Sequence, residues 1–142
     1  MKIKNTEVIS MLNNLSKYKD TKLPQKISYA ITKNNIILSK EYEYYESEIN
    51  KIKELYSNHM FKDKNGEIEM YSNGIPRLDD DTLEKEMIHR INELLLIEND
   101  IDMHIIDEDC FNYDDCNGKY DVLSPIEIMN LQRILCGVGM NE

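Results

Sequence analysis

Residues 25–65 contain neither glycine nor proline, and this uninterrupted stretch is the strongest constraint on the fold. Pro24 directly precedes it and suits the first position of a helix, where its missing N–H costs nothing. The stretch predicts one long helix over about residues 24–60, roughly 55 Å in length. Because such a helix exceeds the diameter of a compact chain of 142 residues, part of it must project or pack against a partner helix.

One face of this predicted helix carries a seam of large side chains, spaced alternately by four and three residues. A period of about 3.5 residues is typical of a coiled coil. If Ile31 takes position d of the heptad, Asn35 takes position a, where a buried Asn can fix register or partner orientation. The alternative is that Asn35 faces solvent near a helix junction. The seam comprises Ile31, Asn35, Leu38, Tyr42, Tyr45, Ile49, Ile52 and Tyr56.

A second helix over about residues 81–98 is the natural partner of the long helix. It opens with a box-like cap at residues 81–84, and Leu83, Met87, Ile91, Leu94 and Leu95 share one face. Together, the long helix and this second helix are predicted to form an antiparallel helical hairpin. Because the second helix is shorter than the seam, the rest of the seam can pair between chains in a homodimer. The residues expected to form this oligomer seam are Asn35, Tyr42, Tyr45, Ile49 and Ile52.

Two shorter helices are expected at the ends of the chain. Asn5 or Thr6 can cap the first, and the Ser124–Glu127 pair forms a capping box for a helix over about residues 125–136. Gly137 with Gly139 ends that helix.

A small β element is expected as well. The turn signals at residues 64–67 and 72–74 flank a hairpin containing Ile68 and Met70. Residues 101–105 alternate apolar and polar, which predicts a strand with Ile101, Met103 and Ile105 facing inward, able to pair with the Ile68 strand. No internal repeat is apparent. The predicted fold is mainly α with a small β element, in a single helical domain over residues 1–142: a long antiparallel helical hairpin, short N- and C-terminal helices and a two-stranded hairpin or sheet.

The charge of the chain is strongly uneven. The net charge is −10, yet residues 1–40 hold eight lysines against two acidic residues, and residues 79–121 hold fifteen acidic residues against three basic ones. An acidic chain without clustered arginines is repelled by phosphate, so we expect no direct nucleic-acid binding. The sequence has no apolar stretch long enough for a signal peptide or membrane span, and its three cysteines lack disulfide or zinc spacing. We expect a cytoplasmic protein with free thiols.

No chemical motif in the sequence predicts catalysis, a metal or a cofactor. An EF-hand register centred on Gly118 puts Tyr113 at the first ligand position and Ser124 at the last, which excludes that calcium motif. The Glu86-x-x-His89 spacing of di-iron bundles occurs once, where two copies are needed. The chain also lacks phosphate-binding glycine motifs and a recognised nucleophile signature. We therefore expect no enzymatic activity.

Four segments resemble a family of small bacteriophage proteins of unknown function. They are Met-Lys-Ile-Lys-Asn at residues 1–5, Leu-Pro-Gln-Lys-Ile-Ser-Tyr-Ala-Ile-Thr-Lys-Asn at 23–34, Ile-Asp-Met-His-Ile at 101–105 and Leu-Ser-Pro at 123–125. The likeness follows most of the chain in order, and its motifs are helix starts and a strand rather than functional residues. The resemblance implies a phage product acting in the cytoplasm of an infected bacterium.

The resemblance implies a binding function, for which three readings remain open. The first is a non-enzymatic inhibitor of a host defence system that occupies a protein surface or sequesters a ligand. The second is a virion-assembly accessory protein for tail or head, and the third, weaker one is a self-associating helical scaffold. Carboxylates can mimic nucleic-acid phosphate toward Arg and Lys side chains of a basic host protein. The candidate partner-binding residues are Asp107, Glu108, Asp109, Asp114, Asp115 and, on the long helix, Tyr44.

Overall fold

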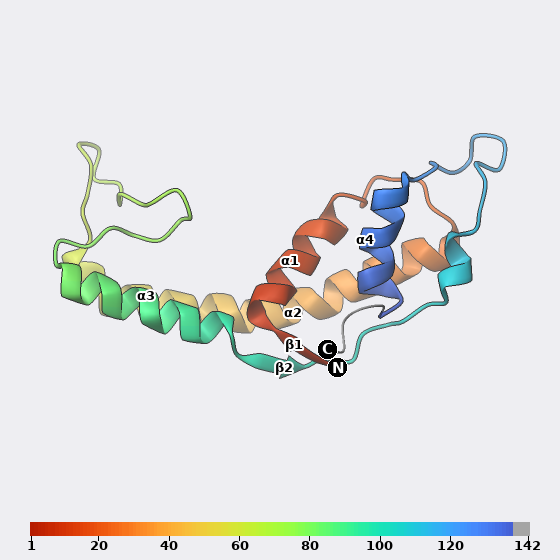
Figure 1. Ribbon diagram of the computed structural model, residues 1–142. Helices are drawn as coiled ribbons and strands as arrows, with labels where there is room; N and C mark the ends of the chain where they lie inside the picture. The colour runs from red at the N-terminus through yellow and green to blue at the C-terminus, as the bar shows by residue number, and fades with distance from the viewer. Residues whose placement is uncertain (138–142) are drawn as a thin grey trace. The chain divides into compact units, whose positions relative to one another are not determined.

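The computed structural model describes residues 1–137 and shows a mainly helical chain with one small antiparallel sheet, which confirms the predicted fold class (Figure 1). In chain order the elements are β1 (Lys2–Lys4), α1 (Asn5–Ser16), α2 (Gln25–Leu55), a 3-10 turn (Ser57–His59), α3 (Asp81–Leu95), β2 (Glu98–Asp100), a second 3-10 turn (Glu108–Phe111) and α4 (Pro125–Leu135). No helix among the described residues is both long and apolar enough to cross a bilayer.

The helix starts agree with the sequence prediction more closely than the helix ends. The long helix stops at Leu55 rather than near residue 60, and the second stops at Leu95 rather than near residue 98. At α4 the Ser124 hydroxyl accepts from Glu127 N at 3.3 Å, and Glu127 Oε1 accepts from Ser124 N at 3.0 Å. The predicted capping box is therefore present. Gly137 follows α4 with a φ of 70°, whereas Gly139 lies outside the described residues.

The chain forms two compact units, and α2 contributes to both. The first unit contains Met1–Tyr42 and the described part of Glu98–Glu142, and the second contains Glu43–Ile97. In the first unit, α1 contacts α4, and their apolar faces pack with the start of α2 in one buried core. Its fully buried side chains include Ile3, Leu15, Ile27, Leu38, Leu131 and Leu135.

The sheet of the first unit differs from the predicted one. β1 and β2 lie antiparallel, with Ile3 opposite Asn99 (Figure 1). The observed strand β2 therefore ends just before the predicted strand at residues 101–105, and it pairs with the N-terminal strand β1. Ile101 and Met103 are buried as expected, but Ile105 is 45% exposed. The expected pairing with the Ile68 strand is wrong, because Ile68 belongs to the second unit and its bridge partner is Lys62.

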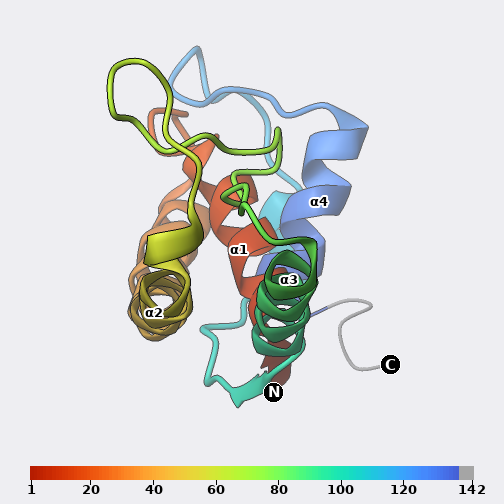
Figure 2. The ribbon, with the colours of Figure 1, turned by 90° about the vertical axis from the view of Figure 1, so that its left-hand side faces the viewer.

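In the second unit, α3 packs along the C-terminal part of α2, which confirms the helical hairpin (Figure 2). Ile49 and Ile52 of α2, with Tyr56 directly after the helix, meet Met87 and Ile91 of α3 in a second, smaller core. Ile49, Ile52 and Tyr56 are positions of the predicted seam, so the seam periodicity correctly identified the face of α2 that packs in this core.

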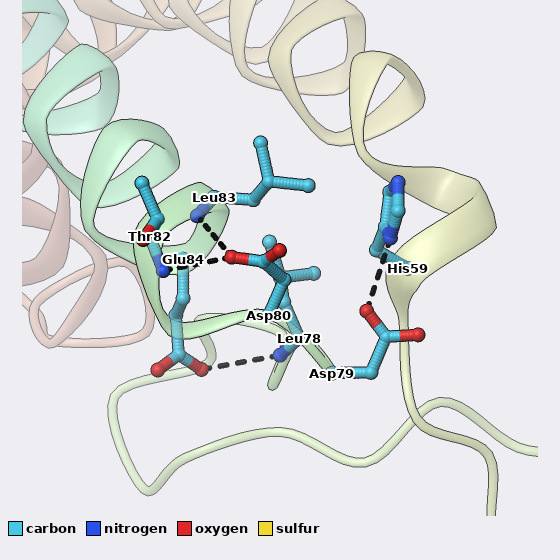
Figure 3. A network of polar contacts seen from close by, with 7 residues as sticks. All are labelled: His59, Leu78, Asp79, Asp80, Thr82, Leu83 and Glu84. Carbon is cyan, nitrogen blue, oxygen red and sulfur yellow. Dashed lines mark hydrogen bonds and ion pairs between the residues drawn. The ribbon is translucent and has the colours of Figure 1, made fainter.

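The cap of α3 begins one residue earlier than the predicted box. The Asp80 carboxylate accepts from Thr82 N at 2.9 Å and Leu83 N at 3.1 Å, so Asp80 is the N-cap (Figure 3). Glu84 does not close a box with Asp81. Its carboxylate accepts from Leu78 N at 3.1 Å and thereby fastens the preceding loop to the first turn of α3.

Candidate functional site

The acidic segment, residues 107–115, begins with a short turn that is anchored in the core of the first unit. Asp107 Oδ1 accepts from Asp109 N at 2.9 Å and so caps the 3-10 turn, whose last residue, Phe111, is 5% exposed. Asp114 Oδ1 accepts from Cys116 N at 2.9 Å. The carboxylates of Asp107, Glu108, Asp109, Asp114 and Asp115 belong to exposed residues. The segment therefore presents acidic groups from a backbone with defined turns.

The loop that follows the acidic segment is closed by a pair of tyrosines. The rings of Tyr113 and Tyr120 meet edge to face with centroids 5.9 Å apart, and Tyr113 Oη donates to the Asp121 carbonyl at 2.7 Å. Asp121 in turn forms two hydrogen bonds with the main chain of Lys22. Its carboxylate accepts from Lys22 N at 2.9 Å, and its own N–H donates to Lys22 O at 2.7 Å. Burial raises the pKa of Tyr113, and Asp121 and Glu127 add to the rise, so Tyr113 remains a neutral donor at physiological pH.

A groove of about 480 Å³ lies between the first turns of α2 and the beginning of the acidic segment. Tyr29, His104 and Ile106 supply its ring and apolar surfaces, while Lys26 and Asp107 supply its charges. An adjoining hollow of about 460 Å³ shares Lys26 and Asp107 and adds Asp109. The first turn of α2 contains no acidic residue of its own, and Asp107 and Asp109 line the hollow together with Gln25 at the start of that helix.

The main chain at His104, on one side of this groove, is fixed by Asn34. Asn34 Nδ2 donates to His104 O at 2.8 Å, and Asn34 Oδ1 accepts from His104 N at 2.7 Å. The side chain of Asn34 is fully buried, and the ring of His104 meets that of Tyr29 edge to face at 5.3 Å. Asn35, the predicted seam residue, is half-buried beside it. The heptad argument placed Asn35 in the seam, whereas the asparagine that is fully buried on this turn of α2 is its neighbour Asn34.

The remaining seam residues and Tyr44 differ in accessibility. Tyr42 packs partly against the core of the first unit, Ile49 and Ile52 pack against that of the second, and Tyr45 is half-buried. Tyr44 is 70% exposed. Tyr44 is thus open to a partner, whereas most of the seam already has contacts inside its own chain.

The loop between α2 and α3 contains a closed ring of main-chain hydrogen bonds that the sequence did not reveal. Phe61 N donates to Arg77 O at 3.1 Å, Arg77 N to Glu69 O at 3.0 Å, and Glu69 N to Phe61 O at 2.9 Å. The three residues are eight positions apart. A second set of three hydrogen bonds has the same spacing, because its donors are eight positions apart and so are its acceptors. These bonds run from Asp63 N to Glu67 O, from Tyr71 N to Ile75 O and from Asp79 N to His59 O, each at 2.8 Å.

This loop therefore repeats one eight-residue hydrogen-bonding pattern three times, although no internal repeat was expected. It replaces the predicted hairpin around Ile68 and Met70, and its pairings are single bridges rather than continuous strands. The predicted turns are present, because Gly66 and Gly74 adopt φ values of 79° and 82°, which favour glycine. The only clear sequence signal of the repeat is the eight-residue spacing of two Asn-Gly pairs.

The side chains of Phe61, Glu69 and Tyr71 lie around the guanidinium of Arg77. Its guanidinium lies 5.4 Å from the Phe61 centroid and 5.8 Å from that of Tyr71, and its Nη1 is 3.2 Å from Glu69 Oε2. Phe61 and Tyr71 are 41% and 42% exposed. Aromatic residues and arginine are enriched at protein interfaces, so this cluster is a second accessible surface with interface composition.

Outside these surfaces, two described histidines form ion pairs with acidic residues, and the Cys136 thiol is half-buried. His59 Nδ1 lies 3.0 Å from Asp79 Oδ1 (Figure 3), and His89 pairs with Glu93 rather than with Glu86. Burial raises the pKa of Cys136 from 9.0 to about 11, with Glu108 and other neighbours adding to the rise. Within residues 1–137, no group of three His, Cys, Asp or Glu side chains is placed to hold a metal ion.

Comparison with protein families, curated proteins and solved structures found no match to this chain.

Proposed function

We propose that this chain is a non-enzymatic binding protein whose acidic segment occupies a basic surface of a partner protein. One observation carries the proposal. The five exposed carboxylates are attached to a backbone held by the buried Phe111 on one side and by the Tyr113–Asp121 contact on the other. An ordered display of charge lowers the entropy lost on binding and allows oriented pairing with Arg and Lys side chains.

The resemblance to small phage proteins suggests the setting of this binding. In an infected bacterium, a basic protein surface that normally meets nucleic acid is a natural target for a display of carboxylates. We therefore propose inhibition of a bacterial defence component, by occupation of such a surface, in the host cytoplasm. Sequestration of a small ligand remains the second form of this proposal.

A virion-assembly role is the alternative, and the Arg77 cluster favours it. Phe61, Tyr71 and Arg77 form an exposed surface that is mainly aromatic rather than acidic, and such surfaces fit the apolar patches of structural proteins. Self-association through the seam is the weaker alternative, because Ile49 and Ile52 already pack inside the second unit.

The test of the leading proposal is affinity capture from infected cells with two matched variants. The first combines Glu108→Gln, Asp109→Asn and Asp115→Asn, leaving the turn-forming carboxylates of Asp107 and Asp114 in place. The control combines Glu43→Gln, Glu46→Gln and Glu54→Gln on the exposed face of α2, with the same change in net charge.

We expect the wild-type protein and the control to retain a host defence component and the acidic-segment variant to lose it. Capture should also weaken steeply with salt, since exposed charge pairs are screened over about 10 Å at 0.1 M ionic strength. Equal capture by both variants would refute a role for the segment. Capture of phage structural proteins alone would favour virion assembly, and capture of the chain itself alone would favour the scaffold.

A further inference from the structure

We infer that the groove beside the acidic segment is a receptor for one arginine side chain of the partner protein. This inference rests on the proposed function, because Asp107 and Asp109 belong both to the acidic segment and to the walls of the groove and its adjoining hollow. A receptor for one arginine would give the partner a defined contact point, in addition to the general attraction between the acidic segment and a basic surface.

One wall of the groove offers an ordered π surface. The Tyr29 and His104 rings meet at an interplanar angle of 73°. The two hydrogen bonds from the buried Asn34 hold the main chain of His104, while Tyr29 is 56% exposed and available to a ligand. Tyr29 already attracts a cation, because Lys33 Nζ lies 5.8 Å from its ring centroid. A guanidinium can stack on such a ring and is less strongly hydrated than an ammonium.

The other wall offers carboxylates. Asp107 is held by its bond to Asp109 N, so its second oxygen has a defined direction, and Asp109 extends the negative surface into the adjoining hollow. Neither carboxylate forms an ion pair within residues 1–137. A guanidinium donates two parallel hydrogen bonds to a carboxylate, which an ammonium cannot reproduce.

The charge balance favours a cation over an anion in the groove. Lys26 is the one lysine among its lining residues and the Lys33 ammonium lies over the Tyr29 ring, whereas the Asp107 and Asp109 carboxylates line the groove and hollow with Glu108 beside them in the chain. An aromatic anion would face these carboxylates at short range. The apolar contribution of Ile106 suits the methylene stem of arginine, which packs on apolar surface while its head stays polar.

The test is an NMR titration of the full chain with three small probes. Nα-acetyl-arginine amide is the cationic probe, Nα-acetyl-citrulline amide is its neutral isostere, and benzoate is an aromatic anion. We expect the arginine probe to shift the ring resonances of Tyr29 and His104 saturably and the citrulline probe to leave them in place. Tyr29→Leu should weaken arginine binding about three- to fivefold, and Asp107→Asn should weaken it further, whereas Leu55→Ala, at an exposed residue of the second unit, should have no effect.

The outcomes separate this inference from the proposed function. Arginine shifts confined to residues 114–115, or shifts of the Tyr29 and His104 rings by benzoate alone, would overturn the arginine receptor. If Tyr29→Leu retains full capture of a partner that the acidic-segment variant loses, the groove is not the anchor, although the proposed function stands. If the arginine probe binds in the groove but the acidic-segment variant still captures its partner fully, the proposed function fails and the receptor remains.

Discussion

Asn34 and His104 lie 70 residues apart in the sequence and are joined by two hydrogen bonds, of 2.8 and 2.7 Å, between one amide side chain and one residue's main chain. The Asn34 side chain satisfies both the N–H and the C=O of His104, which is the role a neighbouring strand would otherwise take. The main chain at His104 is therefore hydrogen-bonded on both sides although residues 101–105 form no strand. This pairing also positions one wall of the groove.

Replacing Asn34 with Ala should destabilise the protein by about 2–4 kcal/mol, because two main-chain groups of His104 lose their partners in a buried setting. Chemical denaturation followed by circular dichroism measures this change. Asn35→Ala, at a half-buried position on the same turn, should cost less than about 1 kcal/mol. Equal effects of the two substitutions would contradict the proposed role of Asn34.

The N-cap of α3 gives a second contrast between neighbouring residues. Asp80→Ala should cost about 1 kcal/mol, because it removes the acceptor of Thr82 N and Leu83 N. Asp81→Ala should cost only a few tenths of a kcal/mol, because Asp81 is an exposed first-turn acid that acts mainly through the helix dipole. Urea unfolding of both variants distinguishes these values, and a larger loss from Asp81→Ala would show that the helix begins one residue later.

The Cys136 thiol should react slowly with alkylating reagents. Its pKa of about 11, raised from 9.0 chiefly by burial, reduces the thiolate fraction near pH 8 roughly a hundredfold. Iodoacetamide at pH 8 should therefore label the exposed Cys116 first and the half-buried Cys136 much more slowly, as mass spectrometry of digests can show. Rapid labelling of Cys136 in the native protein would contradict its burial.

The same pKa shift predicts how Cys136 affects stability at alkaline pH. Because the folded-state pKa is raised, the native protein binds the thiol proton more tightly than the unfolded chain does. The resulting stabilisation is complete below about pH 9 and is lost as the pH rises through about 11. Cys136→Ser should lessen this dependence in denaturation measured across that range.

The sequence predicted what local patterns determine. The absence of glycine and proline after Pro24 identified α2, the Ser124–Glu127 pair located the start of α4, and the seam identified the buried face of α2. Each of these signals lies within a few residues of the structure it specifies. Helix ends were less accurate, because the turns after Leu55 and Leu95 carry no glycine or proline stop signal.

Contacts between distant segments were not predictable from those patterns. The strand partner of residues 98–100 is the N-terminus, and the groove unites residues 25–29 with residues 104–110. Neither pairing can be recognised from the local periodicity of apolar residues. The hydrogen-bonded ring was missed for another reason, since its three segments share main-chain geometry while its central residues, Phe61, Glu69 and Arg77, are chemically unlike.

Arg77 gives the final prediction, because it connects all three segments of that ring. Arg77→Met retains an unbranched apolar stem but removes the charge that interacts with Phe61, Tyr71 and Glu69. We expect it to destabilise the protein by about 1–2 kcal/mol, mostly through the two aromatic contacts, since each exposed cation–π contact contributes about 0.5–1 kcal/mol. Glu69→Gln should cost less than about 1 kcal/mol, because an exposed ion pair contributes little. A double-mutant cycle of Arg77→Met with Phe61→Leu, measured by chemical denaturation, should give a coupling of about 0.5 kcal/mol or more, and strictly additive effects would show that the stacked geometry contributes nothing to stability.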